Sequence, residues 1–218
     1  MNKNLSILTI SQVFGFTAAT ITVFLSGIIG SQIASIKSLA TLPTALTVVG
    51  TAVFAALAAK IMSKIGRKLG FILASLASSI ICLLAAYAIY DRNFILFCIA
   101  NLILGAGMAF THQYRFAAAE SVEKDKAPKA ISILMLSGIV AAFLGISSAN
   151  YTKDLFTDFQ YVGSYITLAI FMFMPTIFFS FYENKNTSEI ELGKNHIDRS
   201  YFEIIFQPRF LQAVIASA

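Results

Sequence analysis

The stretch that decides the fold is RKLGFILASLASSIICLLAAYAIYDR, residues 67–92. Its central part, Leu69 to Tyr90, has 22 residues and no charge, and a pair of charged residues flanks it on each side. A helix needs about 20 predominantly apolar residues to cross the hydrocarbon core of a bilayer. The stretch therefore predicts one transmembrane helix with charged residues at both ends.

Five more uncharged stretches of spanning length lie on either side of this one, with His112 counted as neutral: residues 4–36, 38–59, 93–114, 130–152 and 159–182. The chain of 218 residues is 57% hydrophobic and 12% charged, with a mean hydropathy of +0.77. Soluble domains carry about a quarter charged residues, so a water-soluble globular domain is excluded. We predict an all-α membrane protein that crosses the lipid bilayer six times.

The basic residues fall mainly on one side of these spans. If the N-terminus is cytoplasmic and each span reverses the side, 13 of the 16 Lys and Arg residues face the cytoplasm, and only Lys37, Arg92 and Lys153 face outward. Such a bias sets the orientation of membrane proteins. It predicts a multi-pass protein of the cell inner (cytoplasmic) membrane with a cytoplasmic N-terminus. Because it also accounts for the net charge of +5, we expect no nucleic-acid partner.

The chain divides into three parts by composition. Residues 1–182 hold the six-helix transmembrane bundle, and residues 183–209 are polar with charges of both signs, which is typical of a cytoplasmic linker. Residues 210–218 start a new apolar run. We interpret the chain as the first half of a longer protein, truncated at the start of helix 7, that lacks a C-terminal six-helix half and is a monomer when full length. A gene remnant would give the same pattern.

The connection between the second and third spans, KIMSKIGRK at residues 60–68, is strongly basic. It resembles the loop signature of the major facilitator superfamily, roughly G-x-x-x-D-R-x-G-R-[RK]. The matching residues, with a lysine in place of one arginine, are Gly66, Arg67, Lys68 and Lys64. Ser63 replaces the usual aspartate. The resemblance implies that this loop acts in the conformational cycle and does not contact the solute.

Two further segments are similar to motifs of the family at the expected distances. Gly105-Ala106-Gly107 resembles the glycine-rich end of the fourth-helix motif. Glu120, followed by Pro128-Lys129-Ala130, resembles the acid, proline and basic elements that precede helix 5. Gly145-Ile146 stands where exporters of the family carry Gly-Pro, a difference that favours uptake over drug export.

Two short stretches resemble a bacterial subgroup of these permeases that includes riboflavin-uptake transporters: SLATLP at residues 38–43 and QYRFAAAE at residues 113–120. The resemblance implies the N-terminal bundle of a twelve-helix transporter. Such a transporter moves a small organic solute across the membrane by alternating access. The identity of the solute stays open, because similarity at the level of the fold does not settle a ligand.

The densest polar cluster within any span closes the fourth one. His112 and Arg115 are three residues apart and so share a helical face, and Gln113 adds an amide that both donates and accepts. We interpret this face as part of a cavity for a planar heterocyclic or carbonyl-bearing solute. Two alternatives stay open: Arg115 snorkels to the cytoplasmic interface, and His112 is a structural histidine bonded to a neighbouring helix.

Two more polar residues complete the candidate binding site. Gln12 lies inside the first span, where a solute contact and an interhelical hydrogen bond are alternative roles. Asn101 lies in the fourth span, where the family carries an arginine.

Glu120 is the acidic member of the predicted conformational-cycle set. Five residues on one helix are about 7.5 Å apart along the axis, so Glu120 and Arg115 are not a simple i,i+4 pair. We expect Glu120 to meet Arg67 or Lys68 across the cytoplasmic face, while Arg115 points back into the bundle.

The sequence carries no enzyme motif. It has neither G-x-S-x-G nor H-E-x-x-H, and every Asp and Glu lies outside the spans. We therefore predict no catalytic residue, no metal site and no cofactor. Without a nucleotide-binding loop, transport would draw on an ion gradient or on the gradient of the solute itself. The alternative function is a non-transporting membrane assembly subunit, or an inactive gene fragment.

Overall fold

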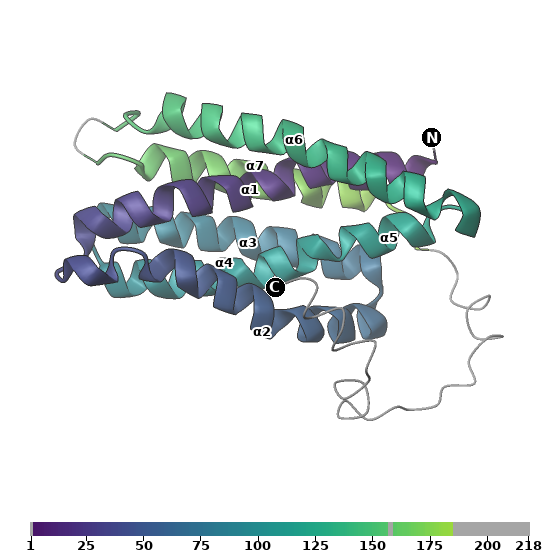
Figure 1. The fold of residues 1–218 in the computed structure, drawn as a ribbon, viewed down its shortest axis with the longest axis horizontal. Coiled ribbons are helices and arrows are strands. Elements are labelled where there is room, and N and C mark those ends of the chain that lie inside the picture. The colour runs from purple at the N-terminus through teal and green to yellow at the C-terminus, as the bar shows by residue number, and fades with distance from the viewer. Residues whose placement is uncertain (1, 157–158, 185–218) are drawn as a thin grey trace. The chain divides into compact units, whose positions relative to one another are not determined.

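The computed structural model describes residues 2–156 and 159–184, which form helices joined by short turns (Figure 1). The helices are α1 (Lys3–Ile33), α2 (Leu42–Ile65), α3 (Arg67–Tyr90), α4 (Phe94–His112), α5 (Tyr114–Glu120), α6 (Ala127–Thr152) and α7 (Val162–Ser180). Two 3₁₀ turns, Lys37–Leu39 and Lys124–Lys126, precede α2 and α6. The described residues contain no strand, in agreement with an all-α chain.

Six segments of the described chain are long and apolar enough to cross a membrane. α4 and α5 together make one of them, Phe94–Glu120, because only Gln113 interrupts the helix and its backbone stays in the right-handed helical region. The other five are built on α1, α2, α3, α6 and α7. The prediction of six spans is confirmed within this part of the chain.

The predicted nine-residue loop at residues 60–68 is wrong. α2 continues to Ile65 and α3 begins at Arg67, so Gly66 alone joins them. Gly66 has φ +83°, in the left-handed region that glycine adopts at little cost, and its N–H donates to the Met62 carbonyl at 3.0 Å. Charged residues can lie within a helix at the membrane surface because their long side chains reach water.

The predicted linker at residues 183–209 and the predicted start of helix 7 at 210–218 lie outside the described residues, apart from Glu183 and Asn184. These two residues are held by side-chain bonds. Glu183 pairs with Lys3 of α1, and Asn184 accepts from the Lys68 backbone N–H of α3 at 3.0 Å. The first two residues of the predicted linker are therefore bonded to α1 and α3.

The spans lie side by side along one long axis, with α2 mainly on α4, α3 on α7, and α1 on α6 (Figure 1). α1 and α7 also pack on each other, as do α3 and α4. Half of the apolar window of α1 and of α7 is buried inside the bundle, against 22% for α2 and 28% for α6. α2 and α6 are therefore the least buried spans of the described bundle.

α2 and α4 approach each other through glycine. A Cβ atom on Gly50 would strike the backbone of Leu102, and one on Gly105 would strike the backbone of Thr47. Small residues allow this spacing in membranes, where close packing contributes much of the attraction between helices. The close approach brings Thr51 of α2 to the carbonyl of Gly105, to which its hydroxyl donates at 3.1 Å.

We predict that Gly105→Ala destabilises the bundle. The added methyl group meets backbone and cannot be relieved by rotation of a side chain, and overpacking of this kind costs about 1–3 kcal/mol. Gly138→Ala in α6 is the matched control, because a Cβ atom at Gly138 meets nothing within 4 Å. Thermal unfolding in detergent should show a lower midpoint for Gly105→Ala alone. Equal midpoints for the two variants would contradict the packing described here.

Candidate functional site

An ion pair joins α3 to the end of α5. Arg67 Nε donates to Glu120 Oε2 and Arg67 Nη2 donates to Glu120 Oε1, both at 2.6 Å. The two parallel bonds make the bidentate arrangement in which arginine and carboxylate interact most strongly. The predicted contact of Glu120 with the basic residues at the start of α3 is confirmed. Its role in a conformational cycle stays a prediction.

The Arg67–Glu120 pair is shielded on its inner side. The Arg67 side chain is 23% exposed and Glu120 is 52% exposed, so the arginine lies deeper than the acid. Tyr182, just beyond α7, packs on Phe71 and Phe179 next to this pair. Burial raises the pKa of Tyr182, so the phenol stays neutral beside the two charges.

A second set of contacts ties α1 to the residue that follows α7. Lys3 Nζ lies 2.5 Å from Glu183 Oε1, Asn4 Nδ2 donates to the Glu183 carbonyl at 2.8 Å, and the Glu183 N–H donates to Asn4 Oδ1 at 3.2 Å. The hydrogen bond from Lys3 lowers the pKa of Glu183 and keeps it a carboxylate. Asn2 Nδ2 also donates to the Ser121 carbonyl at 2.6 Å. Sequence reasoning missed these contacts.

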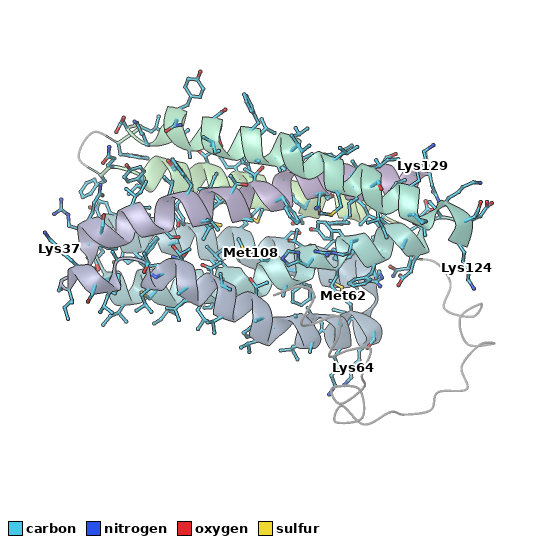
Figure 2. The ribbon with its side chains drawn as sticks, viewed as in Figure 1. Lys37, Met62, Lys64, Met108, Lys124 and Lys129 are labelled. Carbon is cyan, nitrogen blue, oxygen red and sulfur yellow. The ribbon has the colours of Figure 1, made fainter. Side chains whose placement is uncertain are left out.

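Four lysines lie toward the two ends of the bundle. Figure 2 shows Lys64, Lys124 and Lys129 toward one end and Lys37 at the other. The end with the three lysines is also the end where α2 passes into α3. Lys64 is exposed, and its ammonium has no hydrogen-bond partner among the described residues. Of the predicted conformational-cycle residues, only Arg67 and Glu120 are joined by their side chains within this part of the chain.

The polar cluster of the fourth span lies at the break between α4 and α5. Arg115 Nη2 is 3.1 Å from His112 Nδ1, and this is the only side-chain hydrogen bond that Arg115 makes within the described residues. The His112 ring meets Phe16 of α1 edge-on, with ring centroids 5.7 Å apart. The predicted shared face of His112 and Arg115 is therefore confirmed, and it is directed toward α1.

The depth of this cluster follows from Met108. Figure 2 shows Met108 about midway along the bundle. Arg115 is seven residues further along, or about 10 Å nearer the end that carries Lys64. Both His112 and Arg115 are half-buried, as is Gln113 at the break. The guanidinium is thus placed between the middle of the bundle and its charged end.

Gln12 lies one helical turn before Phe16 on α1. Its side chain is 2% exposed, and its Oε1 atom has no hydrogen-bond partner among the described residues. An unpaired buried amide oxygen is costly. Of the two alternative roles of Gln12, an interhelical bond to this oxygen is absent among the described residues.

Asn101 lies apart from this cluster. It is fully buried between α2 and α4, where its Nδ2 donates to the Phe97 carbonyl at 2.8 Å and its Oδ1 accepts from Thr47 at 3.3 Å. Its amide is thus engaged by protein groups on both sides. The structure brings together His112, Arg115 and the Phe16 face of α1, with Gln113 next in the chain, and leaves Asn101 in the helix packing.

Sequence reasoning also missed Thr51. Its hydroxyl lies 3.9 Å from Met108 Sδ, on the face of α4 that leads to His112 one turn later. The signal was weak, because a threonine in a membrane helix commonly bonds to its own backbone. Thr51 makes that bond too, to the Thr47 carbonyl at 2.9 Å.

The cluster can hold a solute by hydrogen bonds and stacking. It offers a fixed cation, an imidazole, an amide and the ring of Phe16, without a carboxylate bonded to them in the described residues. No group of three or more His, Cys, Asp or Glu side chains in the described ranges is placed to hold a metal ion.

The amino-acid sequence is similar to known proteins over nearly its whole length. The sequence matches the Major Facilitator Superfamily over residues 5–218, and the chain belongs to this family. It corresponds to the N-terminal half of a permease of the family. It is 31% identical over 219 residues to the riboflavin transporter RfnT of Brucella anthropi. That alignment covers 98% of this chain but 54% of the relative, so the chain spans about half of its length.

Proposed function

We propose that this chain forms the N-terminal six-helix half of a secondary transporter that takes up a small organic solute across the cytoplasmic membrane by alternating access. Together with a C-terminal six-helix half it makes the complete permease, which acts as a monomer. The family and the six membrane-length helices support this proposal over an assembly subunit. No enzymatic step is part of it.

The observation that carries the proposal is the His112–Arg115 pair on a half-buried face. A charged arginine within a membrane span is costly unless it faces a cavity or a partner. Since no carboxylate among the described residues neutralises Arg115, a solute that accepts hydrogen bonds supplies the missing partner. The solute therefore carries carbonyl groups or a partial negative charge.

We propose a planar heterocycle with carbonyl groups, and riboflavin as its first example. Arg115 and Gln113 would bond to the carbonyl groups, and Phe16 and His112 would pack on the ring. The buried Gln12, whose Oε1 is unpaired among the described residues, would accept from a ring N–H. The relative named a riboflavin transporter supports this choice of solute.

Binding is tested by the fluorescence of riboflavin titrated with the complete permease in detergent. The proposal expects saturable quenching that other isoalloxazines relieve in competition and that a sugar of similar size does not. Quenching that is equally relieved by the sugar, or no quenching at all, would reject a planar heterocycle as the solute.

We further propose that the N-terminus and residue 64 face the cytoplasm, on the basis of the uneven distribution of basic residues. Single cysteines replacing Lys64 and Lys37, in a variant without Cys82 and Cys98, provide the test. In right-side-out vesicles an impermeant maleimide should label the Lys37 site and spare the Lys64 site until the membrane is opened. The reverse pattern would refute this orientation.

A further inference from the structure

An apolar groove of about 610 Å³ lies on the surface between α3 and α7, at the end away from the Arg67–Glu120 pair. Its walls include Leu83 and Tyr87 of α3, Ile166 of α7, and Leu155 and Phe156 of the connection before α7. Leu83, Tyr87 and Leu155 are at least half exposed. In a membrane, a groove of this composition accommodates an acyl chain.

A polar pocket of about 470 Å³ adjoins the groove, and Phe159 lines both. The Phe159 ring packs on Tyr90, with centroids 4.4 Å apart, and so forms the wall between the two. The polar side chains around the pocket are Gln32, Arg92, Asp154 and Gln160. The apolar groove and the polar pocket thus correspond to the acyl chain and the headgroup of a phospholipid.

The charges of the pocket are of both signs. Arg92 and Asp154 both line it, yet no ion pair joins them or engages either with another described residue. The Asp154 carboxylate accepts one bond, from Gln160 Nε2 at 3.1 Å, and Gln32 Nε2 lies 3.4 Å from Gln160 Oε1. Among the described residues, the pocket therefore presents one cation and one anion to a ligand.

The backbone conformation at the end of α3 fixes the position of Arg92. It follows α3 with φ +51°, its N–H donates to the Ile89 carbonyl, and the next N–H, of Asn93, donates to the Ala88 carbonyl. This is the Schellman ending of a helix, whose left-handed position glycine or asparagine normally fills. An arginine at this position lines the pocket despite an unfavourable backbone conformation.

We propose that the groove and the pocket together bind one phosphatidylethanolamine molecule of the surrounding bilayer. Arg92 receives the phosphate, Asp154 accepts from the primary ammonium, and one acyl chain lies in the groove between α3 and α7. Phosphatidylglycerol has the phosphate but no cation for Asp154, and phosphatidylcholine has a quaternary ammonium that cannot donate a hydrogen bond. Phosphatidylethanolamine is therefore preferred, because its headgroup has both a phosphate for Arg92 and a primary ammonium for Asp154.

Native mass spectrometry of the delipidated complete permease, titrated separately with the three lipids, tests this site. Phosphatidylethanolamine should bind at about tenfold lower concentration than the other two, the ratio expected for one additional charge-assisted hydrogen bond. Asp154→Asn should remove the preference for phosphatidylethanolamine. Arg92→Asn should weaken its binding about tenfold while the fold is kept, because asparagine tolerates the left-handed conformation. Lys153→Gln, which removes a neighbouring cation outside both cavities, is the control.

The groove is tested separately. Leu83→Trp places a bulky side chain in the groove and should weaken binding of the lipid. Ile80 is one turn away, 57% exposed and outside the walls of the groove, so Ile80→Trp should leave binding unchanged. Thermal unfolding confirms that each variant is folded. Equal binding of the three lipids, or undiminished binding by Arg92→Asn and Leu83→Trp, would overturn the proposal.

Discussion

Replacement of Glu120 by Gln is expected to slow transport about tenfold while solute affinity changes by less than about threefold. The substituted glutamine keeps one bond to Arg67 at most and lacks the charge, and bonds between charged groups are worth about 1.5–3 kcal/mol, less at a half-exposed site. The pair ties α3 to the end of α5 at the charged end of the bundle, about 7.5 Å along the helix beyond Arg115, and neither of its side chains bonds to the solute cluster. Loss of the ion pair therefore alters the balance between conformations and leaves solute binding nearly unchanged.

The matched control is Glu123→Gln. Glu123 pairs with Lys126 three residues later, and both side chains are more than 60% exposed, so removal of this pair should leave transport within about twofold. Arg67→Gln should resemble Glu120→Gln, and the double variant should be no worse than either single variant. Additive defects, or a large loss of affinity with an unchanged maximal rate, would show that the pair has no role in the cycle.

Arg115→Lys is expected to weaken solute binding about tenfold. An ammonium cannot reproduce the planar donor fork of arginine, and it cannot bond to His112 Nδ1 and to a solute carbonyl in the same geometry. A tenfold loss corresponds to about 1.4 kcal/mol, the order of one good hydrogen bond to a charged group. Equilibrium titration with riboflavin measures it.

Lys129→Gln serves as the control for Arg115→Lys, since it removes an exposed cation near the same end of the bundle but outside the cluster. It should leave binding unchanged. If Arg115→Lys leaves both binding and uptake unchanged as well, Arg115 only snorkels toward the membrane surface and does not belong to the binding site.

The spans could be predicted from the spacing of charges, because a bilayer tolerates few charges over about 20 residues. The residues at which the helices end could not be predicted from this spacing. The basic stretch that contains Lys60, Lys64 and Arg67 was predicted to be a loop. These residues are helical instead, since their long side chains can reach water from a helix, and the chain turns at Gly66 alone. The break at Gln113 also escaped prediction, since no proline or glycine marks it.

The candidate site was predictable in part. Between the start of α3 and the end of α5 the chain crosses the membrane twice, so these two points lie at the same end of the bundle. Contact between Arg67 and Glu120 could therefore be expected. The Lys3–Glu183 pair could not, because 180 residues separate its members and many acids are available to Lys3. Asn101 shows a further limit, since the sequence does not reveal that Thr47 and a backbone carbonyl engage its amide.

A transport function is tested most directly by the uptake of radiolabelled riboflavin into proteoliposomes that contain the complete permease and no nucleotide. Liposomes without protein set the background, and liposomes preloaded with unlabelled riboflavin provide a counterflow control. We expect saturable uptake that preloading accelerates and that Glu120→Gln slows. No uptake above protein-free liposomes, with or without an ion gradient, by protein that still binds riboflavin would contradict a transport function.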